Sequence, residues 1–174
     1  MPARVQARGF TLLELLVVVI LIALLATAAI IAMPSTSVHD RQREEAQRLL
    51  GRLDLAHEEA ILQARSVGLY VAQDGYRFLW FEDDAWHDFA ANHPLRRHEL
   101  PADVRLDVRV EGTEIGLGGG EDDDDDERAP QIYFLAGGEV LPDYELHVLA
   151  DESRSDFLIT AGDETWFELH EDRF

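Results

Sequence analysis

The residue types best suited to chemistry in this chain are its histidines and carboxylates. The run His57 to Ile61, HEEAI, begins like the His-Glu-x-x-His helix of zinc peptidases, but Ile61 stands where the second histidine ligand is required. His87, His93 and His98 lie close together in sequence without the spacing of metal ligands. We therefore predict no metal site, no cofactor and no catalytic residues, and interpret the clustered histidines as surface side chains rather than ligands.

A run of acids is the second group that could bind an ion. Within a predicted loop, 116–128, three glycines precede seven consecutive acidic residues, 121–127. Calcium loops space their ligands and add backbone carbonyls, and a plain run of acids lacks that pattern. We favour a solvated loop over a calcium site because neighbouring carboxylates repel each other and resist burial.

The overall charge and the missing residue types exclude several classes of protein. The chain has 15 Lys+Arg against 35 Asp+Glu, a net charge of -20, which is the wrong sign for a surface that binds nucleic acid. Every cation is arginine, so Schiff-base and phosphate-loop lysines are absent. The lack of cysteine excludes disulfides, thiolate metal sites and cysteine nucleophiles. An enzyme is therefore not expected.

The chain has two segments of different composition, an apolar run near its N-terminus and an acidic remainder that contains the histidines and most carboxylates. Residues 15–33 contain no charge, and a helix of that length rises about 28 Å, close to the thickness of a bilayer's hydrocarbon core. Arg4 and Arg8 precede this run without any acid, so the positive-inside tendency places residues 1–9 in the cytoplasm. We predict a single membrane span, 10–34, with the acidic remainder of the chain on the opposite side.

The segment 35–66 has the pattern of an amphipathic helix. Pro34 ends the apolar run, so a bend or break is expected there. Beyond it, apolar residues recur every three or four positions. They are Ala46, Leu49, Leu50, Leu53, Ala56, Ala60, Ile61 and Ala64. We expect this face to pack on a folded domain rather than on lipid, since a helix that binds membranes would be more basic.

The remaining residues, 67–174, consist of short β-rich runs. Leu69–Gln73 and Tyr76–Phe81 flank Asp74-Gly75 and predict a tight hairpin. Further predicted strands are 86–89, 95–100, 104–110, 131–135, 140–149, 156–161 and 165–170. We thus predict an α+β fold: a long N-terminal helix, membrane-spanning in its first half and amphipathic in its second, packed on an antiparallel β-sandwich-like domain.

Four aromatic residues lie within or near the hairpin. Trp80, Phe81, Trp86 and Phe89 could form an exposed binding surface. Aromatic side chains in alternating strands are more often part of a core, and we favour that interpretation.

The octet Arg8-Gly9-Phe10-Thr11-Leu12-Leu13-Glu14-Leu15 is far more specific than any of these patterns. It resembles the leader of type IV pilins and type II secretion pseudopilins, which a membrane peptidase cleaves after the glycine. The resemblance implies cleavage between Gly9 and Phe10 and N-methylation of Phe10. It also implies that Glu14 pairs with the terminal amine of Phe10 on a neighbouring subunit. A carboxylate in hydrocarbon is costly, and that partner would offset the cost.

The second half of the chain resembles the GspH/FimT pseudopilin family. The similarity lies in the strand 104–110, the segment 131–135, the turn Gly137-Gly138-Glu139 and the strand that ends at 145–148. It implies a minor pseudopilin: a structural subunit of the type II secretion pseudopilus near its tip, which supports export of folded proteins across the outer membrane. The implied location is the inner membrane with the C-terminal domain in the periplasm. The implied partners are other pseudopilins, major and minor, the prepilin peptidase and the inner-membrane assembly platform.

A FimT-like minor type IV pilin, involved in pilus assembly or DNA uptake, is the alternative within this family. A pilin that binds DNA should present a basic surface, yet residues 151–174 contain two arginines against eight acids. The charge therefore favours the pseudopilin.

Overall fold

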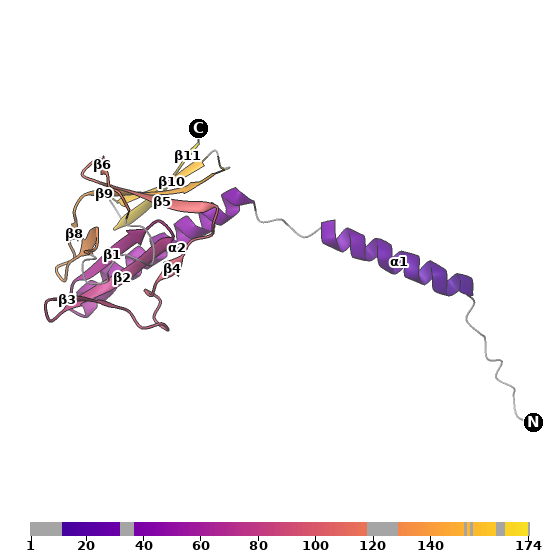
Figure 1. Ribbon diagram of the computed structural model, residues 1–174, viewed down its shortest axis with the longest axis horizontal. Coiled ribbons are helices and arrows are strands. Elements are labelled where there is room, and N and C mark those ends of the chain that lie inside the picture. Colours follow the sequence, from indigo (N-terminus) through magenta and orange to yellow (C-terminus); the bar gives the residue numbers. More distant parts are fainter. Residues whose placement is uncertain are drawn as a thin grey trace, which may run out of the picture. The chain divides into compact units, whose positions relative to one another are not determined.

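The computed structural model describes residues 12–31, 37–117, 129–151, 153, 155–162 and 166–173. The chain divides into two compact units, Met1–Thr36 and Ser37–Phe174. The first unit contains helix α1, Leu12–Ile31 (Figure 1). Gly9, Phe10 and Pro34 lie outside the described residues, as does most of the acidic loop 116–128, so the cleavage site, the bend and the loop stay predictions.

Helix α1 covers much of the predicted membrane span. Its described side chains, 12–25, are all exposed and apolar except for Glu14. No helix among the described residues combines the length and hydropathy that a membrane crossing requires. The predicted span, 10–34, extends past the described residues at both ends and is not confirmed.

Helix α2, Val38–Leu62, begins the second unit with a capping box. The Asp40 amide donates to Ser37 Oγ (3.0 Å), and the Ser37 amide donates to the Asp40 carboxylate (3.2 Å). The Ser37 hydroxyl also donates to the Asp40 carboxylate (2.7 Å). The two hydrogen bonds that this carboxylate accepts from Ser37, from the hydroxyl and from the amide, lower the pKa of Asp40. The helix ends four residues before the predicted 66, because Ala64 adopts a positive φ of 50°, a conformation that terminates helices.

The first sheet contains the predicted hairpin. Its strands are β1 (Val67–Ala72), β2 (Gly75–Glu82), β3 (Ala85–Asp88), β4 (His98–Glu99), β7 (Ile132–Phe134) and β8 (Val140–Leu141). They follow the order β3-β2-β1-β7-β8, with β4 paired to β2. The hairpin is confirmed, but Ala72 pairs with Gly75, so its two turn residues are Gln73 and Asp74 rather than Asp74 and Gly75.

The second sheet has the order β11-β10-β9-β5-β6 (Figure 1). Its strands are β5 (Val104–Val110), β6 (Thr113–Glu114), β9 (Tyr144–Ala150), β10 (Ser155–Ala161) and β11 (Phe167–Arg173). The predicted strand 140–149 is two strands instead of one, since Pro142 offers no amide to a ladder. The chain thus passes at Pro142-Asp143 from the first sheet to the second.

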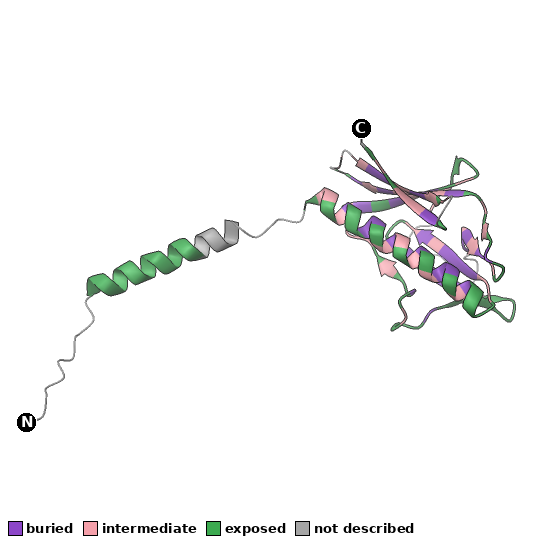
Figure 2. Cartoon of the chain, turned by 180° about the vertical axis from the view of Figure 1, so that it is seen from behind, coloured by how far each residue is buried: buried purple, intermediate pink, exposed green. Residues whose placement is uncertain are grey.

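The core lies where α2 meets both sheets, and Figure 2 shows the buried and exposed sides of the helix. The helix buries Ala46, Leu49, Leu53, Ala56 and Ala60, as its periodicity predicted. Opposite them lie Leu69, Phe78, Phe134, Leu146, Val148, Phe157 and Ile159, all buried. Ile61 and Ala64 are exposed, unlike the rest of the predicted stripe. The α+β class, a helix packed on antiparallel sheets, is confirmed.

Candidate functional site

The predicted assembly site lies at the start of α1. Glu14 is exposed in the first turn of that helix, where a carboxylate interacts favourably with the helix dipole. Its predicted partner is the amine of Phe10 on a neighbouring subunit, and Phe10 is outside the described residues, so the structure does not test this pair. The pairing of Glu14 with Phe10 stays a prediction.

One flank of α2 binds the segment that precedes β5. Arg41 forms an ion pair with Asp103, and its Nε donates to the same carboxylate at 3.1 Å. Further along, Glu45 lies 2.7 Å from the ring of His98 and 2.5 Å from Arg48. The Arg41 side chain lowers the pKa of Asp103 through its hydrogen bond. Because these helix residues recur at spacings of four and three, one side of α2 fixes the whole segment.

The other flank of α2 binds the second sheet. The Gln42 amide donates to the carbonyl oxygens of Val148 (2.7 Å) and Ser155 (2.8 Å), and the Gln42 side chain is fully buried. Arg43 forms an ion pair with Glu171 at 2.7 Å. The two flanks together set the orientation of the sheets on the helix.

The histidines have separate structural partners. His57, the first residue of the zincin-like run, is buried, its Nε2 lies 2.8 Å from the Gly138 carbonyl oxygen, and its ring lies 4.1 Å from that of Trp166. His87 packs on Trp80, and His93 stacks on an aromatic ring of the core. In the described part of the chain, no three histidine, aspartate or glutamate side chains are placed to hold a metal.

The prediction that all four aromatics belong to the core is wrong in part. Phe89 is buried, but Phe81 is 38% exposed, because neighbouring residues of a strand face opposite sides of the sheet. On the outer face of the first sheet its ring lies 5.0 Å from that of Trp86, which in turn lies 5.8 Å from Tyr133. Sequence reasoning considered an exposed surface for Phe81 and Trp86 but favoured the core, and it did not foresee Tyr133 beside them.

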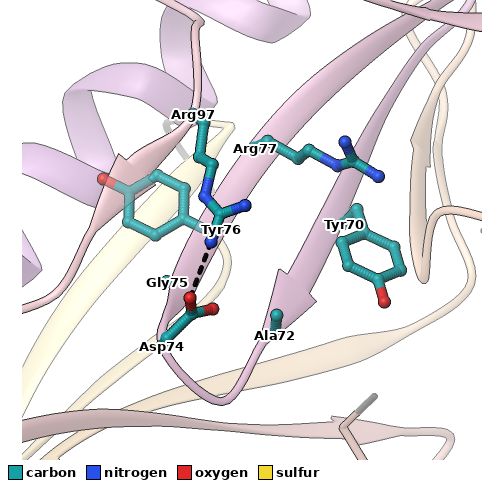
Figure 3. Close-up of a pocket in the computed structure, with 7 residues that line it drawn as sticks. All are labelled: Tyr70, Ala72, Asp74, Gly75, Tyr76, Arg77 and Arg97. Carbon is teal, nitrogen blue, oxygen red and sulfur yellow. Dashed lines mark hydrogen bonds and ion pairs between the residues drawn. The ribbon is translucent and has the colours of Figure 1, made fainter. Parts of the chain in front are cut away.

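A small pocket lies on the β1–β2 hairpin (Figure 3). Its lining residues are Tyr70, Ala72, Asp74, Gly75, Tyr76, Arg77 and Arg97. Arg97 forms an ion pair with Asp74 at 2.6 Å, and the Arg77 guanidinium lies 5.1 Å from the centre of the Tyr70 ring. The polar groups of the pocket thus bind one another, in an arrangement typical of a protein surface rather than of a nucleophile beside its base.

Models of two known protein families match this chain. A model of the prokaryotic N-terminal methylation motif matches residues 4–30. A second model, that of type II transport protein GspH, matches residues 45–161, from the first third of α2 to the end of β10. The chain belongs to the GspH family of type II transport proteins.

Individual relatives agree with this assignment. The type II secretion system protein H of Aeromonas hydrophila is 31% identical over 145 residues, covering 80% of this chain and 79% of the relative. The protein of the same name from Pseudomonas aeruginosa is 30% identical over 141 residues, covering 78% of this chain and 80% of the relative. The GspH family therefore accounts for most of the chain's length.

Solved structures of the family share the fold. A crystal structure of the minor pseudopilin EpsH from the type II secretion system of Vibrio cholerae matches with a TM-score of 0.62 and 26% identity, covering 76% of this chain and 95% of that one. The solution structure of GspH from Escherichia coli matches with a TM-score of 0.54 at 17% identity, covering 82% of this chain and 95% of that one, and supports the fold alone. The GspH family is one of structural pseudopilin subunits.

Proposed function

We propose that this chain is a minor pseudopilin, a subunit of the type II secretion pseudopilus near its tip, which supports export of folded proteins across the outer membrane. The observation that carries the proposal is the presence of both family signatures in one chain. A methylation motif occupies residues 4–30, and a GspH domain begins 15 residues further along at residue 45. The first would provide anchoring and assembly, and the second the folded domain that contacts other pseudopilins.

Processing and anchoring follow from the N-terminal motif. A membrane peptidase cleaves between Gly9 and Phe10 and methylates Phe10. The segment 10–34 then holds the subunit in the inner membrane as a single-pass protein, with the domain 67–174 in the periplasm. The exposed apolar side chains of α1 suit a helix that first contacts lipid and later the helices of other subunits.

Glu14 sets the axial register of the assembled subunit. A carboxylate among the apolar side chains of α1 is expensive in hydrocarbon and is stabilised by a cation. The amine of Phe10 on an adjacent subunit is that cation in the proposed filament. The assembly platform in the inner membrane would insert the subunit once this pair forms.

Three variants separate processing from assembly. Gly9→Ala should leave the leader attached, as seen by the mass of the purified chain, and abolish secretion. Glu14→Gln should be processed normally and still fail to secrete, since it removes only the charge. Leu13→Ala is the matched control and should behave as wild type. Normal secretion by Glu14→Gln would contradict the assembly role.

A further inference from the structure

The outward face of α2 contains features that the isolated domain does not explain. We define this face as six exposed residues spaced by three or four positions, so that they lie on one side of the helix. They are Glu44, Gln47, Gly51, Asp54, Glu58 and Leu62. Figure 2 shows the exposed side of α2 turned away from the sheets. No described element of the domain covers it.

Gly51 stands at the centre of this face, in the interior of a 25-residue helix. A glycine there destabilises the helix relative to alanine, because it loses more backbone entropy on folding. A Cβ at this position would meet nothing within 4 Å, and its φ is not positive. Neither space nor backbone conformation within the chain therefore requires glycine. A second chain that approaches the helix closely would require it.

Asp54 and Glu58 follow Gly51 on this face and repel each other. They are four residues apart on one helix, where like charges are destabilising. Neither forms an ion pair with a cation among the described residues, whereas Glu44 and Glu59 pair with Arg48 and Arg65. Partial burial and the charge of Glu58 raise the pKa of Asp54. A cation from outside the chain would relieve this repulsion.

The C-terminal end of the face is apolar. Leu62 is 77% exposed, and its neighbour Ile61, at the edge of the face, is 42% exposed. Exposed apolar side chains bordered by polar residues are a feature of protein interfaces. Anionic lipid headgroups and nucleic acid would be repelled by Asp54 and Glu58. The chemistry fits a protein segment that carries arginine or lysine.

We propose that the outward face of α2 is the docking surface for a basic segment of a neighbouring filament subunit. The partner's backbone lies against Gly51, its cation lies between Asp54 and Glu58, and its apolar side chain covers Leu62. The proposal rests on the proposed function, since it assumes that the chain joins a filament. It adds the face through which the domain binds and the chemistry of what it binds.

Two variants of the full-length chain test the surface by secretion in the host. Gly51→Leu fills the space that the partner's backbone would occupy, and leucine is the better helix former. We expect it to unfold at the same temperature as wild type or higher, yet to secrete roughly tenfold less. Asp54→Arg should reduce secretion by a similar factor. Glu114→Arg, the same change at an exposed acid of β6, is the control and should secrete normally.

Crosslinking tests the contact itself, and the composition of the chain excludes competing side-chain reactions within it. The chain contains no cysteine and no lysine, so one introduced cysteine is the only thiol and no side-chain amine is available within it. A reagent that joins a thiol to an amine, attached to Glu58→Cys, should capture another pseudopilin of the host. The same reagent on Glu114→Cys should not. In a double variant that also carries Asp54→Arg, the crosslinked product of Glu58→Cys should be absent.

The outcomes separate this proposal from the proposed function. If Gly51→Leu and Asp54→Arg secrete as wild type and Glu58→Cys captures no pseudopilin, while Gly9→Ala still abolishes secretion, the docking surface is wrong and the pseudopilin function stands. A loss of secretion accompanied by a lower unfolding temperature of Gly51→Leu would also overturn the proposal, because the glycine would then serve the fold. If Gly9→Ala secretes normally, the proposed function itself fails.

Discussion

The ring of His98 lies 2.7 Å from the carboxylate of Glu45, and the two side chains are only 17% and 6% exposed. This contact joins β4 to the first half of α2 across 53 positions of sequence. Arg48 binds the same carboxylate at 2.5 Å, so Glu45 is buried with two partners. One buried acid of the helix therefore holds β4, while Arg41 holds Asp103 at the other end of the segment before β5.

His98→Ala should destabilise the domain by about 1–3 kcal/mol, because the buried Glu45 loses one of its hydrogen bonds and keeps only Arg48. Urea unfolding of the unit Ser37–Phe174 measures this change in the free energy of unfolding. His170→Ala removes an exposed pair with Glu168 and should cost less than about 0.5 kcal/mol. Equal effects of the two substitutions would show that the buried pair contributes nothing.

Gln42→Ala should cost about 1–2 kcal/mol, since the carbonyls of Val148 and Ser155 each lose a donor, while the removal of Gln42 Oε1, buried without a hydrogen-bond partner among the described residues, offsets part of the loss. Gln47→Ala is the matched control on the exposed side of the same helix and should be neutral or slightly stabilising. Amide hydrogen exchange should also show faster exchange in β9 and β10 for Gln42→Ala alone. If Gln42→Ala leaves the unfolding midpoint unchanged, the glutamine does not anchor the second sheet.

The domain should lose stability in alkali. Burial raises the pKa of Tyr76 from 10.0 to about 12 and also raises that of Tyr144. Above pH 10 the unfolded chain releases the phenol proton while the folded chain keeps it, so stability falls as the pH rises through this window. The loss from Tyr76 approaches about 2–3 kcal/mol at pH 12.

The substitution Tyr76→Phe tests whether Tyr76 causes the loss of stability in alkali. The Tyr76 hydroxyl is buried without a hydrogen-bond partner among the described residues, so its removal should be neutral or stabilising at pH 7. The variant should then lose less stability than wild type between pH 10 and pH 12 in urea titrations. Tyr133→Phe, at a half-buried tyrosine, is the control. If Tyr76→Phe loses as much stability as wild type between pH 10 and pH 12, Tyr76 is not the cause of the alkaline loss.

Ser37→Ala should destabilise α2 by about 1 kcal/mol, because it removes the acceptor for the Asp40 amide. The same cap stabilises the ionised form of Asp40, whose lowered pKa makes its contribution present above about pH 4 and lost as the pH falls. The wild type should thus lose more stability on acidification than Ser37→Ala does. Identical acid transitions would show that the cap does not act through Asp40.

Periodicity predicted the helix face and most strands, because both depend on residues adjacent in sequence. It did not predict that Gln42, Glu45 and His57 are buried, although they continue the spacing of Ala46, Leu49 and Leu53. Their partners are Val148, Ser155, His98 and Gly138, and the fold alone brings these to the helix. Burial of a polar residue follows from such distant contacts.

The errors among the strands have local causes. Trp80 and Phe81 are neighbours on β2, so the period of two should have placed them on opposite faces. Pro142 should likewise have divided the strand 140–149. The turn between β2 and β3 was harder to foresee, because Asp83 and Asp84 both adopt positive φ, 49° and 61°, without the usual glycine.

A clean deletion of the gene in its host tests the central claim most directly, with exoenzyme activity in the medium and transformation by added DNA scored in the same strains. The account predicts that secretion collapses, that exoenzyme accumulates in the periplasm, and that the wild-type gene restores export. Transformation should be unaffected, in keeping with the acidic domain. Normal secretion together with lost transformation would contradict the account and favour a FimT-like minor pilin.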